Sequence, residues 1–202
     1  LRRKVCEQLP SLSPPIALSV VTSLVTSIQE TEPGPAMARM MEFLVWCVTQ
    51  PPIKTVLLDS IASDAGQRAA LIGCLEHSLA GDSEIQAGAI RVIQTLCDPE
   101  ISLSGENLDL SLSESLPDKE TLQSLISCLL ATSETKGLSS QSSLFSCLMA
   151  MTETKYMCDL IRWSLLTNSG KEKYMFLLLK RMAVEFSTTS SDFESFLTFV
   201  IH

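Results

Sequence analysis

Apolar side chains recur every three or four residues along most of this chain, and short polar or proline-containing turns interrupt them. This spacing is typical of amphipathic α-helices. The pattern is clearest on both sides of a short turn, where Gly81 suits the left-handed position after a helix and Asp82 or Ser83 suits the N-cap of the next. The sequence therefore predicts helices at residues 65–79, with Asp64 as a candidate cap, and at 84–97, lying antiparallel side by side.

The same alternation of apolar stripe and polar or proline-rich break extends through both halves of the chain. No alternation of strands and helices is visible, so the fold class predicted is all-α. Roughly ten helices joined by short turns favour an α-solenoid of stacked antiparallel pairs. The further helices predicted are at residues 1–9, 16–29, 36–49, 53–62, 117–131, 139–152, 155–167, 171–186 and 192–202.

An acidic, serine-rich stretch without a clear period follows the helix predicted at 84–97. A loop of this length is uncommon inside a compact domain and indicates a boundary or a functional segment. We therefore divide the chain into an N-terminal helical half at 1–98, a connection at 99–116 and a C-terminal helical half at 117–202. The chain opens already in helical phase, which suggests a fragment of a larger protein.

Composition supports a sizeable core, since 46% of residues are hydrophobic. The formal net charge of −8 argues against a whole domain that binds nucleic acid electrostatically. The charge is uneven, however, and cations gather near the C-terminus on what could be a surface for RNA or an acidic partner. The alternative is an ordinary solvated helix face. The candidate basic surface comprises Arg162, Lys171, Lys173, Lys180 and Arg181.

Seven cysteines lie mostly within apolar runs, and none shows the spacing of a zinc site. They are typical of small buried side chains in a reducing, intracellular compartment. Cys74 and His77 share one predicted helix and resemble a nucleophile and its base, but no third group completes them. No nucleotide-binding motif and no membrane-spanning run is present. We expect no enzyme activity, no metal, no cofactor, no small-molecule substrate and no membrane partner.

A methionine-rich group lies on the predicted helix at 36–49. Methionine commonly fills gaps in cores, so burial is the first interpretation. If the group is exposed, a partner surface is the second. Its members are Met37, Met40, Met41, Phe43 and Trp46.

Residues 71–97 resemble the armadillo and HEAT repeat families, in which an apolar helix, a Gly-Asp turn and a second helix with a small residue form one repeat. This resemblance implies an intracellular, non-catalytic scaffold that binds a peptide or a protein helix on its surface. The residues that carry it are Leu71, Leu75, Gly81, Asp82, Ile85, Gln86, Ala89, Ile93 and Leu96.

The run Leu116–Leu130, LPDKETLQSLISCLL, also resembles the Virilizer family of large scaffold subunits in the mRNA adenine-methylation writer. That resemblance implies a nuclear protein of the mRNA N6-adenosine methyltransferase complex, with RNA contact through the basic C-terminal helices. The two expectations differ in salt dependence, because only RNA binding through cations should weaken steeply with salt.

Overall fold

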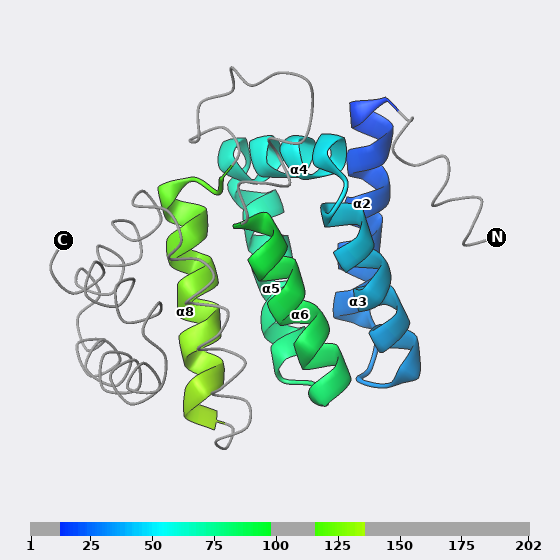
Figure 1. Cartoon of the computed structure of the whole chain (residues 1–202), viewed down its shortest axis with the longest axis vertical. Coiled ribbons are helices and arrows are strands. Elements are labelled where there is room, and N and C mark those ends of the chain that lie inside the picture. Colours follow the sequence, from blue (N-terminus) through cyan, green and yellow to red (C-terminus); the bar gives the residue numbers. More distant parts are fainter. Residues whose placement is uncertain (1–12, 98–115, 136–202) are drawn as a thin grey trace, which may run out of the picture.

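The structure, a computed structural model, describes residues 13–97 and 116–135, and this part of the chain is helical without a strand (Figure 1). The predicted all-α class is confirmed for these residues. The helices are α2 (Pro14–Glu30), α3 (Pro35–Val48), α4 (Pro51–Ser63), α5 (Ala65–Leu79), α6 (Ser83–Leu96) and α8 (Lys119–Thr135).

Helix starts follow two kinds of local signal. Helices α2, α3 and α4 begin with Pro14, Pro35 and Pro51 in their first turns, where the missing N–H costs nothing. Helices α5 and α6 begin at aspartate caps. Asp64 Oδ1 accepts hydrogen bonds from the backbone N–H groups two and three residues ahead, at 2.7 and 3.3 Å, and Asp82 Oδ1 accepts the equivalent pair at 3.1 Å each. The predicted Asp64 cap is confirmed, and of the two candidates Asp82 and Ser83 the cap is Asp82.

The prediction of a left-handed glycine at the α5–α6 turn is wrong. Ala80 ends α5 in the right-handed region, with φ −76°, and the φ of Gly81 is not in the left-handed range. Glycine is needed here for space instead. A Cβ at Gly81 would lie 3.1 Å from both the carbonyl oxygen of Ser78 and Cγ2 of Ile85, so any side chain would push the turn away from α6.

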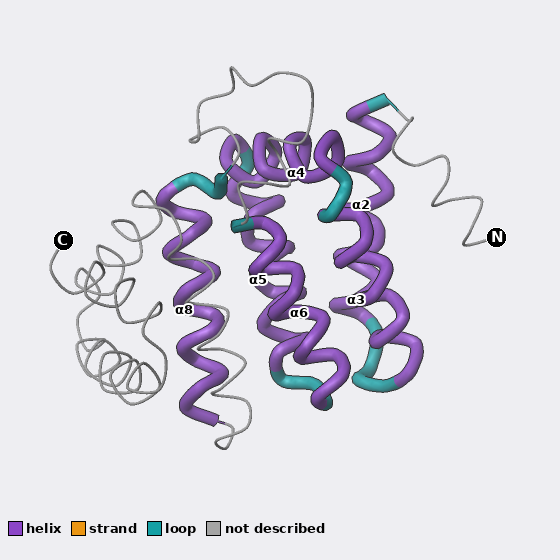
Figure 2. Tube along the Cα trace, viewed as in Figure 1, coloured by secondary structure: helices purple, strands orange, loops and turns teal. Residues whose placement is uncertain are grey.

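The helices form two antiparallel pairs, α2 with α3 and α5 with α6, whose connecting turns lie at the same end (Figures 1 and 2). Equivalent helices contact each other, since α2 packs on α5, α5 packs on α8, and α3 packs on α6. Helix α4 crosses the opposite end and contacts α2, α3, α5 and α8. The described helices therefore lie in two rows, α2–α5–α8 and α3–α6, with α4 across one end.

The rows meet in one continuous apolar core. Small residues let the pairs approach closely, since a Cβ added at Gly88 of α6 would lie 3.1 Å from Cβ of Met41 on α3. Two hydrogen bonds join α2 to α5, from Thr22 Oγ1 to Gln67 Oε1 at 3.3 Å and from Gln29 Nε2 to the carbonyl of Ala70. The fully or nearly buried side chains include Val21, Ile28, Met37, Leu44, Ile61, Leu71, Leu75, Ile85, Ala89, Val92, Ile93, Leu122, Leu125 and Ile126.

The predicted helices fall within four residues of the observed bounds wherever the structure describes them, and the helix predicted at 65–79 matches α5 at both ends. The predicted helix at 53–62 begins two residues earlier, because the prolines that end α3 also form the first turn of α4. The three-part division at 98 and 116 stays a prediction. The helices predicted at 1–9, 139–152, 155–167, 171–186 and 192–202 lie outside the described residues, as does nearly all of the connection at 99–116.

Candidate interaction surface

The candidate basic surface predicted from the sequence lies outside the described residues, so it stays a prediction. Its members are Arg162, Lys171, Lys173, Lys180 and Arg181.

Cys74 and His77 both make contacts that hold the structure together. Burial raises the pKa of the Cys74 thiol to about 12, and a hydrogen bond from Ser78 lowers it only in part. His77 donates from Nε2 to the carbonyl oxygen of Thr31, 3.1 Å away, where α2 ends. The imidazole therefore links α5 to the end of α2, while the thiol stays protonated inside the core.

The methionine-rich group of α3 divides between the core and the surface. Met37 and Met41 are buried, at 0% and 1% exposure, which confirms the core interpretation for these two. Met40, Phe43 and Trp46 are only half-buried. The rings of Phe43 and Trp46 stack with centroids 5.8 Å apart and an interplanar angle of 5°. These three side chains follow one another about one helical turn apart and form a partly buried stripe, which we call the aromatic stripe.

Arg39 on α3 is exposed and lies one turn before Phe43, and Arg91 is exposed on α6. Neither guanidinium forms an ion pair or a hydrogen bond in the described part of the chain. An unpaired arginine beside an aromatic ring is free to stack on a partner's ring or to bind a carboxylate.

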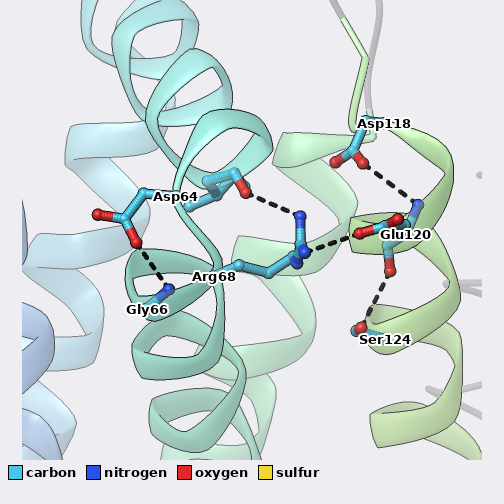
Figure 3. A network of polar contacts seen from close by, with 7 residues as sticks. Asp64, Gly66, Arg68, Asp118, Glu120 and Ser124 are labelled. Atoms are coloured by element: carbon cyan, nitrogen blue, oxygen red, sulfur yellow. Dashed lines mark hydrogen bonds and ion pairs between the residues drawn. The ribbon is translucent and has the colours of Figure 1, made fainter.

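A polar joint ties α8 to the rest of the molecule (Figure 3). Arg68 of α5 donates from Nη1 to the carbonyl of Ile61, at the end of α4, and from Nη2 to Glu120 of α8 at 2.7 Å. Asp118 accepts from the backbone N–H of Glu120, so it caps α8. Because Glu120 is 73% exposed, its ion pair with Arg68 mainly sets the position of α8 and adds little stability.

Two buried polar atoms at this joint lack a hydrogen-bond partner, Oδ1 of Asp118 and Oγ1 of Thr121. Thr121 is 0% exposed. An unsatisfied buried hydroxyl costs about 1–3 kcal/mol relative to one that is hydrogen-bonded. The start of α8 is therefore held less favourably than the caps of α5 and α6.

Sequence reasoning did not single out Lys54 or the Arg68 joint. Lys54 is 0% exposed. Its helical spacing to Leu58 and Ile61 places it on the buried side of α4, so its burial could have been predicted from the sequence. Burial raises the pKa of Cys97 to about 12, although the positive charge of Lys54 acts to lower it. The Arg68–Glu120 pair spans 52 residues, and no local pattern could have indicated it.

No group of three or more histidine, cysteine, aspartate or glutamate side chains in residues 13–97 and 116–135 is placed to hold a metal ion. Within that same part, no helix has the length and apolar character that crossing a membrane requires.

Comparison with known proteins gives one distant likeness. No family model matches the sequence, and no solved structure matches the chain. Among curated proteins, the human "Protein virilizer homolog" is 27% identical, over an alignment that covers 64% of this chain and 9% of that protein. The chain thus spans about 9% of the length of the curated relative that it matches.

Proposed function

We propose that this chain is a non-catalytic helical-repeat scaffold, of the armadillo or HEAT kind, that binds protein partners within an intracellular complex. It would act by holding surfaces in fixed relation, with an extended face offered to a peptide or a helix. This proposal requires no catalytic residue, metal or cofactor.

The observation that carries the proposal is the contact of equivalent helices in successive pairs. Helix α5 packs on α2 and on α8, and α6 packs on α3, so the α5–α6 pair has the α2–α3 pair on one side and α8 on the other. Helix starts recur at similar intervals, from Pro14 to Ala65 to Lys119 in one row and from Pro35 to Ser83 in the other. Such regular stacking favours a repeat that can present a long surface.

The distant likeness to the virilizer homolog favours a more specific role. We propose that the scaffold belongs to the mRNA N6-adenosine methyltransferase complex and acts in the nucleus. The run Leu116–Leu130, which resembles the Virilizer family, includes the first turns of α8.

The test is affinity purification of the tagged chain from cells, with identification of the bound proteins and RNA. We expect other subunits of the methyltransferase complex in the eluate. A matched sample with Ala89→Asp, which disrupts the α6 packing, should lose them, while Ala87→Asp on the exposed side of α6 should keep them. Recovery of other complexes without methyltransferase subunits would refute the Virilizer-like role. If both variants still bind these partners, binding through the stacked helices is refuted.

An alternative function is RNA binding, which the cluster of cations near the C-terminus favours. Fluorescence anisotropy with a labelled single-stranded RNA at increasing salt distinguishes it. Binding through four or five cations should weaken steeply with salt, with a slope that falls by about one per phosphate contact removed. Affinity that is independent of salt, or unchanged when Lys171, Lys173, Lys180 and Arg181 are all replaced by glutamine, would exclude this alternative.

A further inference from the structure

Helices α5 and α8 carry the same short motif. In α5 it reads LIGCL, residues 71–75, and in α8 it reads LISCL, residues 125–129. The two helices pack on each other in one row, and their first turns lie together (Figure 1). The first leucine and the cysteine of each motif are buried in the core. Equivalent residues of the motif therefore occupy equivalent positions in the row.

The isoleucine of each motif lies on the side of its helix that faces the next place in the row. Ile72 of α5 lies one turn after Arg68, whose guanidinium reaches Glu120 of α8. In α8, Cys128 faces back toward α5, since two ionisable groups of α5 act electrostatically on its thiol. Ile126 lies two positions before Cys128, a little over half a turn around the helix, so it faces away from α5.

Ile126 is nevertheless fully buried. It is 0% exposed, although the described helices that α8 packs on are α5 and α4. Helix α4 meets α8 near its start, where Arg68 joins the carbonyl of Ile61 to Glu120, and Ile126 lies more than one turn further along (Figure 3). The structure is of one chain, so the residues that cover Ile126 belong to this chain and lie outside the described ranges.

The spacing of helix starts indicates which segment covers Ile126. Starts in its row step from Pro14 to Ala65 to Lys119, and a similar step reaches the helix predicted at 171–186. The other row follows the same interval. Its starts step from Pro35 to Ser83, and similar steps reach the helices predicted at 139–152 and 192–202.

We propose that the helix predicted at residues 171–186 packs on α8 as the next member of the α2–α5–α8 row and covers Ile126. Large apolar residues of this segment recur at the spacing of one helical face, Met175, Leu178, Leu179 and Met182. Lys173 and Lys180 fall on the opposite side of the same period, so docking on α8 leaves these two cations to face a partner.

The proposal rests on the stacked rows of the proposed scaffold, but its test involves no partner. Failure of the docking would therefore be distinguishable from failure of partner binding, which the affinity purification measures.

Photo-crosslinking of the full chain tests the contact. The photoreactive residue p-benzoylphenylalanine in place of Gln123, one turn before Ile126, should cross-link to residues 171–186, as mapped by mass spectrometry. The same residue in place of Ser124, one turn before Cys128, should cross-link to α5 instead. Both positions are half-buried, so the two substitutions differ mainly in direction. Cross-links from position 123 to any other segment, or none where position 124 reaches α5, would overturn the proposal.

Amide hydrogen exchange gives an independent readout. Ile126→Ala removes the apolar group at the contact and should speed exchange in residues 171–186 by at least about tenfold, because losing a buried side chain weakens local packing. Ile72→Ala, at the equivalent place in α5, should speed exchange in α8 instead. Unchanged exchange in 171–186 would contradict the docking. The cross-links are measured with Ile126 in place, so they decide the matter if Ile126→Ala unfolds the chain.

Discussion

Replacing Ala89 with aspartate should destabilise the protein far more than the same replacement at Ala87. Ala89 is 0% exposed on α6 and lies one turn from the buried residues Ile85 and Ile93. Ala87 is exposed on the same helix, two residues away. The two variants share helix, chemistry and propensity change, and they differ in burial alone.

The magnitude follows from that burial. Aspartate costs about 0.7 kcal/mol relative to alanine in a helix interior, and both variants bear that cost. At position 89 the carboxylate also enters a core without a cationic partner, or forces α6 away from its neighbours, at about 3–5 kcal/mol more. For a chain of this size, each 1 kcal/mol lowers the melting temperature by about 2–4 °C. Ala89→Asp should therefore lower the melting temperature by at least about 6 °C.

Thermal unfolding followed by circular dichroism measures the difference. A third variant, Glu84→Lys, reverses an exposed charge in the first turn of α6 and should cost under about 1 kcal/mol through the helix dipole. Equal losses for Ala89→Asp and Ala87→Asp, or a larger loss for Glu84→Lys, would contradict the packing of α6 described above.

Two further outcomes are expected of buried groups. Thr121→Val removes an unsatisfied hydroxyl at constant shape. In urea melts it should leave the free energy of unfolding unchanged or raise it by about 1 kcal/mol, whereas the exposed control Thr26→Val should not raise it. A lower free energy of unfolding for Thr121→Val would show that the Thr121 hydroxyl is hydrogen-bonded. Burial raises the pKa of Cys74, Cys97 and Cys128 from 9.0 to about 12 in the folded state. Unfolding therefore releases protons above pH 9, and stability should fall between pH 9 and about 12 by up to about 1.4 kcal/mol per pH unit for each thiol. Urea melts across this range should show a shallower fall for Cys97→Ala, and an identical slope would contradict the burial of that thiol. These thiols should also resist alkylation until the protein unfolds.

Helix positions and caps could be predicted from the sequence because their causes are local. A cap such as Asp64 or Asp82 needs only the backbone N–H groups within three residues, and the apolar period repeats every turn. The conformation of Gly81 could not be predicted in the same way. A glycine after a helix usually serves a left-handed residue, whereas here the nearness of Ile85 excludes a side chain. A left-handed backbone and a lack of space for a side chain both require glycine, so the residue alone does not tell which applies.

The interaction surface could be predicted only in part, because burial depends on which helices meet. The sequence placed Met37, Met40 and Met41 in one group, since all three fall within a turn or so of α3. Contact with α2 and α6 buries two of them and leaves Met40 at the edge with Phe43 and Trp46. The Arg68–Glu120 joint has the same origin, since it exists only once α8 lies beside α5.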